Sequence, residues 1–251
     1  MAALLDSLAA GFTGDGARRA ALDAALRDGL PHARSEAWKY TSLRALERRA
    51  FSPAPLSHAP VDPALVAGIP APRLVFVNGR HDPALSDTAG APEGARLLTM
   101  AEALASPDPR EANVLERSYA QADEIFARLN AALAGDGAVL RIAEDVAVEA
   151  PVHLVFIGMA TDGDLAWHAR HLVELRRGAS ATVIEHHIAG SAHAHLGNAI
   201  AHVHLAPGAA LRHARAQDES DRATLFTRTD AVLARESSYR RLDLELGGAL
   251  S

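Results

Sequence analysis

Histidine is the residue type most able to do chemistry in this chain, because ten of its thirteen histidines lie between positions 153 and 213. Neutral imidazoles are common ligands of transition metals. His202 and His204 are two positions apart, and residues at that spacing point to the same face of a β-strand. With the adjacent pair His186 and His187, they are the candidate metal ligands of the sequence.

The surroundings of His202 and His204 come close to the pattern of cupin enzymes, in which a glycine precedes a His-x-His pair and a glutamate follows. Gly197 supplies the glycine, but Pro207 and Gly208 occupy the places where the glutamate is needed. A cupin-like metal-binding enzyme that uses the two histidines is therefore kept as an alternative interpretation.

A structural role for these histidines is also consistent with the sequence. Val203 and Leu205 make the other face of the same strand apolar, which predicts that the two histidines between and before them face solvent or a partner. His186 and His187 are neighbours and should point to opposite faces of a strand, which weakens them as a chelating pair. The histidines in the Gly/Ser/Ala-rich stretch 189–197 are expected in a loop.

No catalytic template is present. The chain has no Gly-x-Ser-x-Gly, His-Glu-x-x-His or Gly-x-Gly-x-x-Gly motif, and it has no cysteine. Its single lysine, Lys39, does not lie in a phosphate-binding loop. The closely spaced acids Asp243 and Glu245 are expected to be solvated on the outside of a strand. We therefore assign no catalytic and no cofactor-binding residue, and we expect the protein not to be an enzyme.

Composition limits the class of protein. The chain has 251 residues, of which 49% are hydrophobic and 22% charged, with a net charge of −6. This composition is typical of a globular protein and gives no reason to expect binding to nucleic acid or to a membrane. No stretch approaches the ~20 apolar residues that span a bilayer. The N-terminus has no cationic segment typical of a secretory signal, so we expect a cytoplasmic protein.

The region 1–135 is predicted to be largely helical, with mixed α/β structure. Helical spacing of apolar residues predicts helices over 17–28, 35–49, 97–105 and 115–133. Residues 73–77 form a predicted strand, closed by the turn dipeptide Asn78-Gly79. The proline-rich stretch 52–72 is predicted to be a linker or an extended surface segment.

From position 136 to position 251 short β-type runs recur at a regular spacing. Turn residues between them fall at Asp145, Gly178, Gly208 and Ser237, so the intervals between successive turns are nearly equal. A strand–turn–strand unit that returns about every 30 residues predicts a stacked β-solenoid. An antiparallel sandwich with regularly spaced hairpins is the alternative.

One motif in the N-terminal region identifies a family. The segment Arg34-Ser35-Glu36-Ala37-Trp38-Lys39-Tyr40-Thr41 resembles the N-terminal helix motif of the SufB/SufD family, whose members are subunits of the SUF iron–sulfur cluster assembly complex. The resemblance continues through residues 74–79, 81–86, 184–187, 205–209 and 217–220. Within the family, the absence of cysteine and the short N-terminal region favour the SufD branch over the SufB branch.

The resemblance implies a right-handed parallel β-helix behind an N-terminal helical region. It implies a non-enzymatic scaffold subunit that pairs with a SufB-like subunit, or with itself, and works with the SufC ATPase. No cofactor is expected to bind firmly to this chain; iron or an iron–sulfur cluster is expected only in the assembled complex. The histidine-rich strands could then offer a transient iron site.

Members of the family continue beyond the position of Ser251, with further rungs and a helical domain that binds SufC. We therefore expect a partial β-helix without those parts, we leave SufC binding open for this chain, and we carry over no site residue from the family. A purely structural β-solenoid module that binds a partner but no metal is the remaining alternative.

Overall fold

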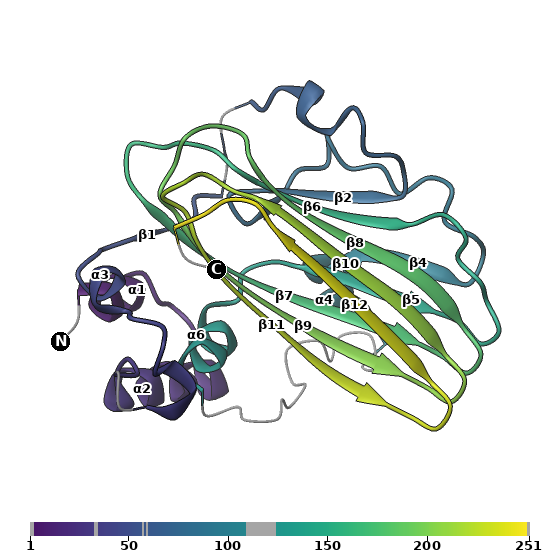
Figure 1. Ribbon diagram of the computed structural model, residues 1–251, viewed down its shortest axis with the longest axis horizontal. Coiled ribbons are helices and arrows are strands. Elements are labelled where there is room, and N and C mark those ends of the chain that lie inside the picture. Colours follow the sequence, from purple (N-terminus) through teal and green to yellow (C-terminus); the bar gives the residue numbers. More distant parts are fainter. Residues whose placement is uncertain (1–2, 33–34, 57, 59, 109–123, 250–251) are drawn as a thin grey trace.

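The computed structural model describes residues 3–32, 35–56, 58, 60–108 and 124–249. It is mainly β: a β-solenoid of about four turns follows a helical N-terminal region (Figure 1). From position 138 onward successive strands of each sheet pair in parallel, which confirms the predicted β-helix and rules out the antiparallel sandwich. Within the described residues, no helix is both long enough and apolar enough to cross a membrane.

Two six-stranded sheets form the solenoid, and the chain alternates between them. Sheet A contains, in spatial order, β11 (Thr224–Leu233), β9 (Leu196–Leu205), β7 (Leu165–Leu175), β5 (Ala138–Ile142) and β4 (Ala95–Thr99), with β1 (Ser52–Pro53) paired to β7. Sheet B contains β12 (Ser238–Glu245), β10 (Ala210–Asp218), β8 (Ser180–Ala189), β6 (Val152–Gly158), β2 (Arg73–Val77) and β3 (Arg80–His81).

The period of the stack follows from the register of sheet A. Val139 lies opposite Leu172, and Leu172 lies opposite His202. The sequence separations within these two pairs equal the separations from the predicted turn residue Asp145 to Gly178 and from Gly178 to Gly208. The fold class could therefore be read from turn spacing, because parallel stacking places equivalent turns above one another.

Each turn between sheet A and sheet B contains one residue in the left-handed region. These residues are Asp145, Gly178, Gly208 and Glu236, with φ between 60° and 70°. The turns are joined by backbone hydrogen bonds, for example from the Gly178 N–H to the Pro207 carbonyl. The last turn was predicted at Glu236-Ser237, and within it the left-handed backbone falls on Glu236 rather than on Ser237.

The apolar core of the solenoid lies between the sheets, beside these turns. Val173 and Leu175 of β7, Val203 and Leu205 of β9 and Leu211 of β10 are at most 2% exposed. Side chains alternate along a strand, so the same parity points inward on every rung. The position of Val203 and Leu205 in this core confirms that the alternate face of β9 is the apolar one.

One end of the strands of sheet A is covered by helices (Figure 1). They are α1 (Ala3–Ala10), α2 (Gly16–Asp28), α3 (Arg44–Glu47) and α6 (Ile125–Leu133), with the 3₁₀ helix η1 (Glu36–Trp38). Elsewhere, α4 (Met100–Leu104) packs on β5 and β7, and the 3₁₀ helix η2 (Pro63–Val66) packs on sheet B. Buried leucines of α1, α2 and α6 form a second apolar cluster, which packs against Ala166 of β7 and Leu196 of β9. The helical region is thereby attached to the β-helix by apolar burial.

Two of the predicted helices differ from the structure. The predicted helix 35–49 is broken into η1 and α3, because Thr41 and Ser42 favour turns over helix interiors and because Trp38 packs on Phe126, with 5.4 Å between ring centroids. In the predicted helix 97–105, strand β4 continues to Thr99. The helix begins only at Met100, where Thr99 and Glu102 form a capping box.

The other N-terminal predictions fare better. The helix at 17–28 is α2, and the end of the predicted helix 115–133 is α6; residues 115–123 lie outside the described part of the chain. Strand β2 covers 73–77, and Asn78-Gly79 makes the predicted two-residue hairpin turn to β3.

The proline-rich stretch is not a free linker: it pairs as β1, and Val61 and Val66 pack on sheet B. The proposed domain division at 135/136 stays a prediction; β1, β2 and β4 precede it and join the two sheets.

Candidate functional site

The interior of the β-helix changes character along its strands. Beside the turns the inward-facing side chains are apolar, but farther from the turns the same parity places ionisable groups inside. Five of these groups form what we call the interior ladder: Glu185 of β8, Arg215 of β10, and Arg241, Asp243 and Glu245 of β12. Because charged groups are rarely buried without partners, this part of the molecule is the first candidate for a functional site.

Charges alternate in sign along the interior ladder. Arg241 Nη1 lies 3.8 Å from Glu185 Oε1, and Arg241 Nε lies 2.8 Å from Asp243 Oδ1. Arg215 continues the series, with Nε 3.3 Å from Asp243 Oδ1 and Nη2 2.7 Å from Glu245 Oε1. Three carboxylates face two guanidinium groups, so the ladder carries one surplus negative charge when all five groups are ionised.

Glu185 is the most deeply buried charge of the ladder, at 4% exposure. Burial alone would raise its pKa, but hydrogen bonds from His187 and His213 outweigh that effect and hold the pKa well below its usual range. The Glu185–His213 contact is 2.5 Å, whereas the Glu185–His187 contact is 3.4 Å. Glu185 is therefore an ionised carboxylate inside the fold.

His213 lies between an arginine and a carboxylate. Arg241 Nη1 lies 2.9 Å from His213 Nδ1 and 3.2 Å from its Nε2. The Nε2 atom in turn lies 2.5 Å from Glu185 Oε1. His213 thus links Arg241 to Glu185, and this short hydrogen-bonded chain holds three side chains in one arrangement.

Two further aromatic groups complete this part of the interior. His171 of β7 accepts a hydrogen bond from the Ala138 N–H through Nδ1, and its Nε2 has no hydrogen-bond partner among the described residues. Burial lowers the pKa of His171 to about 4, so the ring is neutral at physiological pH. Phe156 of β6 stacks on His187, with 4.8 Å between ring centroids.

A buried hydrogen bond between a histidine and a carboxylate closes the interior on the side away from the turns. His193 Nε2 lies 3.0 Å from Glu219 Oε2, and His195 Nδ1 accepts from the Leu165 N–H. Trp167 of β7 packs edge-on against His195, with 5.5 Å between centroids. The two histidines do lie outside the strands, as predicted, but they are buried and bonded rather than solvated.

The four candidate metal ligands do not meet at one point. His187 faces inward, whereas His186 lies on the outer face of sheet B and shares a hydrogen bond of 2.9 Å with His153, so the predicted opposite orientation is confirmed. Burial lowers the pKa of His186 to about 4. His202 and His204 share the outer face of sheet A. The sequence predicts that both face solvent or a partner; His202 does not face solvent, since it is 7% exposed, and His204 is half-buried.

Carboxylates do lie beside His202 and His204, but arginines bind them. The register places Glu174 opposite His204 and Asp230 opposite His202. Glu174 accepts from Arg141 at 2.8 Å, and Asp230 pairs with Arg228 at 3.0 Å. Among the residues that the structure describes, no three His, Cys, Asp or Glu side chains are grouped closely enough to hold a metal ion. Metal binding by the four histidines therefore stays a prediction.

The cupin alternative is wrong on architecture. Cupin sites lie in double-sheet jelly rolls of antiparallel strands, whereas β9 pairs in parallel with both of its neighbours. The expectation of solvated acids holds for Asp243 and Glu245, whose side chains are 37% and 46% exposed. Both also bind Arg215, because they have the same parity as Tyr239, which packs against the apolar core.

Comparison with known proteins covers almost the whole chain. The family model for the SufBD protein N-terminal region matches residues 13–154. The chain belongs to the SufBD family. A second SufBD model, the core domain of the SUF system for FeS cluster assembly, matches residues 156–251 and so covers most of the β-helix.

Two curated SufBD relatives support this assignment. The iron–sulfur cluster assembly SufBD family protein of Synechocystis is 28% identical over 235 residues, which is 88% of this chain and 51% of that protein. The iron–sulfur cluster assembly protein SufD of Escherichia coli is 31% identical over 229 residues, which is 90% of this chain and 51% of that protein. The chain therefore spans about half the length of the curated SufBD proteins it matches.

Sequence reasoning missed the interior ladder, although a signal for it was present. Glu185 and His187 have the same parity as Val183, which an apolar pattern assigns to the inside. Moving one rung onward from Arg215 leads to Asp243, which is its partner in the register. Following inward parity from rung to rung would have placed these charges beside one another.

Proposed function

We propose that this chain acts as a non-catalytic assembly subunit in iron–sulfur cluster biogenesis. The observation that carries the proposal is the match to both SufBD models along residues 13–251, which includes the β-helix and the region before it. A β-helix is a rigid scaffold, because each rung is bonded to the next along its whole length. The iron–sulfur cluster is the cargo of such a subunit rather than its resident cofactor.

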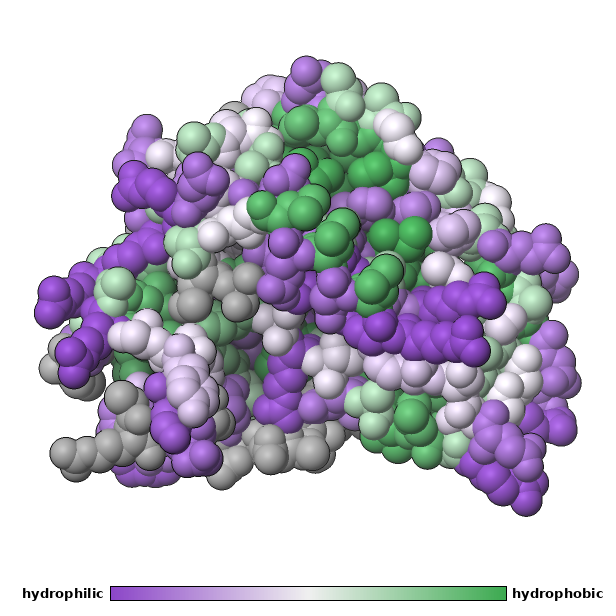
Figure 2. Space-filling model, viewed as in Figure 1, coloured by the Kyte–Doolittle hydropathy of each residue, from purple (hydrophilic) through white to green (hydrophobic). Residues whose placement is uncertain are grey.

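The proposed partner is a SufB-like subunit, bound through the β-helix. Support comes from the outward-facing leucines of the last strand and the position after it: Leu242, Leu244 and Leu246 are 69%, 51% and 65% exposed. Figure 2 shows apolar groups among polar ones over β12. Exposed apolar rows of this kind are typical of protein–protein contacts.

A second copy of this chain would also fit a row of exposed leucines, and the SufC ATPase is the further partner proposed from family membership. Both are distinguished from a SufB-like partner by the composition of the recovered complex. A purely structural solenoid would bind a partner but would leave iron loading unaffected by the histidines.

Iron is proposed to contact this subunit only within the assembled complex, through the histidine-rich strands. His187 is the candidate with the best surroundings for this role, since it lies beside the ionised carboxylate of Glu185. Replacing His186, His187, His202 and His204 by alanine should lower iron loading of the complex. Unchanged iron loading in a complex of normal size would contradict this part of the proposal.

The direct experiment is co-expression of the tagged chain with the SufB-like and SufC proteins of the same source, followed by sizing and mass analysis of the complex. Recovery of the SufB-like subunit in a defined ratio is expected. The double variant Leu242→Asp/Leu244→Asp should abolish that recovery, whereas Leu56→Asp should not. Leu56 is a matched control because it is 89% exposed but lies outside the sheets. Equal recovery with both variants would place the contact elsewhere.

A further inference from the structure

A groove lies on the outer face of sheet B, beside the turns. Its volume is about 340 Å³, and it is lined by β8, β10, β12 and the segment 147–149 that precedes β6. Ala210 lies in the middle of this surface, opposite Ser180 on one side and Ser238 on the other. The short side chain of Ala210 leaves room between its longer neighbours.

Two arginines stand side by side in this groove. The register places Arg212 of β10 directly opposite Arg240 of β12, and both line the groove. Both point outward, because side chains alternate along a strand and the preceding residues, Leu211 and Tyr239, pack in or against the apolar core. Both arginines are exposed. Their donors are therefore accessible from solvent and lie on the same face.

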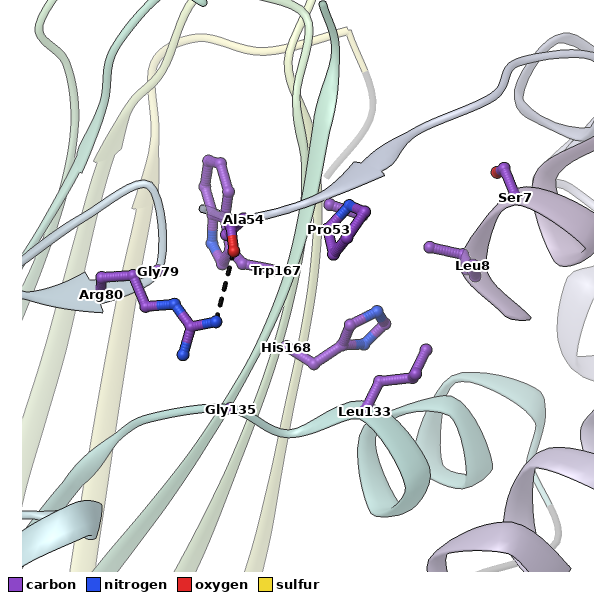
Figure 3. Close-up of a pocket in the computed structure, with 11 residues that line it drawn as sticks. Ser7, Leu8, Pro53, Ala54, Gly79, Arg80, Leu133, Gly135, Trp167 and His168 are labelled. Carbon is purple, nitrogen blue, oxygen red and sulfur yellow. Dashed lines mark hydrogen bonds between the residues drawn. The ribbon is translucent and has the colours of Figure 1, made fainter. Parts of the chain in front are cut away.

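The charges of these two arginines are not balanced by the chain itself. Neither guanidinium group has a hydrogen-bond or ion-pair partner among the described residues. Arg80 offers a contrast, because it lines the cavity between the helical region and the β-helix and its Nη2 donates to the Ala54 carbonyl at 3.3 Å (Figure 3). Like charges directly opposite each other on neighbouring strands destabilise a sheet. Arg212 and Arg240 thus form an uncompensated positive site on a chain whose net charge is −6.

The other polar groups of the groove favour an anion at the arginine pair. Thr182 of β8 lies opposite Arg212, and Ser238 lies two positions before Arg240, on the same face of β12. Their hydroxyl groups can donate to an anion. Glu149 also lines the groove, but β8 lies between its segment and β10. Two strand spacings of about 4.8 Å each, with solvent between, weaken its repulsion of an anion bound at the arginines.

We propose that this groove binds a phosphate group, with its oxygens on the guanidinium groups of Arg212 and Arg240 and on the Thr182 hydroxyl. A phosphate dianion balances both positive charges, whereas a carboxylate balances only one. A guanidinium group also matches phosphate in shape, since it can donate two parallel hydrogen bonds to phosphate oxygens. The groove is larger than inorganic phosphate, so a phosphate monoester fits with its organic part over Ala210.

The bound phosphate would join the outer faces of β10 and β12, the last two strands of sheet B. It would stabilise the folded chain by mass action. Because the groove is on the outer face, this site is separate from the interior ladder, and it does not depend on the proposed role in cluster assembly.

The test is phosphorus NMR on the full chain, with inorganic phosphate titrated at constant ionic strength. We expect saturable binding in the millimolar range and a rise in Tm that sodium chloride does not produce. The double variant Arg212→Met/Arg240→Met should abolish saturable binding, because each lost charge-assisted hydrogen bond weakens it about tenfold or more. Arg44→Met/Arg48→Met is the matched control: it removes the same charge from exposed arginines of the helical region and should bind phosphate as the unaltered chain does.

Three outcomes would overturn the proposal. They are the absence of saturable binding to the unaltered chain, equal affinity in the two double variants, and displacement of phosphate by an equal concentration of triglutamate, which would assign the groove to an acidic polypeptide. Circular dichroism establishes that Arg212→Met/Arg240→Met is folded. If it is not, Arg212→Lys/Arg240→Lys replaces it. Lysine keeps the charge but cannot donate two parallel hydrogen bonds, so this variant should bind phosphate measurably more weakly, and unchanged affinity would contradict the proposal.

Discussion

The two halves of the solenoid interior are built from the same strands but are stabilised in different ways. In the half beside the turns, Val203 and Leu205 are buried among other aliphatic side chains. In the half away from the turns, Glu185 and Arg215 occupy positions of the same inward parity and are also nearly inaccessible. Both halves exclude water, so stability comes from apolar burial in the first and from mutual pairing in the second.

This difference affects how each half should respond to a single substitution. An aliphatic core loses contacts in proportion to the atoms removed. In a buried ion network, removing one partner leaves the other charge unpaired. The protein interior solvates that charge poorly, so the loss of stability is large. The polar half should therefore be the less tolerant of the two, even for changes that preserve shape.

The largest effect is expected for Glu185→Gln, which keeps the shape of the side chain and removes the charge that faces His213 and Arg241. The free energy of unfolding should fall by about 4 kcal/mol, as for other broken buried ion pairs. Urea unfolding at pH 7 measures it. Glu144→Gln is the control, since the Glu144–Arg177 pair is exposed and should contribute little to stability. Similar losses in the two variants would contradict the difference between the halves.

A somewhat smaller loss is expected for Leu205→Ala in the apolar half. Leu205 is completely buried, so the substitution should lower the free energy of unfolding by about 3 kcal/mol through lost contacts and a residual cavity. Leu233→Ala is a matched control, because Leu233 is paired with Leu205 in the register but is 51% exposed. The control should lose well under half as much; equal losses would mean that burial does not set stability here.

The pH dependence should originate in the polar half and its surroundings. The pKa of His171 is about 4 in the folded chain, below the value of about 6.5 in an unfolded one, so the unfolded chain binds the proton first as the pH falls. Stability should therefore decline from about pH 6.5 toward pH 4, by about 1.4 kcal/mol per pH unit for each such histidine. The depressed pKa of Glu185 adds its own loss only below about pH 4.3.

His171→Asn tests this assignment, because asparagine can still accept from the Ala138 N–H but does not titrate. Urea unfolding at pH 7, 6 and 5 should give a shallower decline for the variant than for the unaltered chain. An identical pH dependence would assign the proton uptake to other groups.

The smallest effects are expected at the turns beside the apolar half. Gly208→Ala places a Cβ in a left-handed backbone with open space around it, at a cost of about 1 kcal/mol. Gly178→Ala has a similar φ, but its Cβ would clash with Asp145 Oδ1, so the Asp145 side chain must also move and the cost should be about 2 kcal/mol. Thermal unfolding of both variants measures the difference. A larger loss of stability for Gly208→Ala than for Gly178→Ala would contradict the expected cost of the clash with Asp145.

Prediction succeeded where structure repeats locally. The turn spacing gave the rung length, the alternation around Val203 gave the inner face of β9, and Asn78-Gly79 gave the hairpin between β2 and β3. It failed where a local pattern competed with a distant contact. Helical spacing over 35–49 was overridden by the packing of Trp38 on Phe126, which lies almost ninety positions away in the sequence.

The sequence by itself determined the β-helix, its period and membership of the SufBD family, because each depends on residues that recur or stand close together along the chain. Only the tertiary structure decided which charges are inside. Glu185, Arg215 and Asp243 come from three successive rungs; Glu185 is 4% exposed, whereas the Asp243 side chain is 37% exposed, although arginines lie beside both. Such pairings depend on distances between rungs and segments, which no local pattern contains.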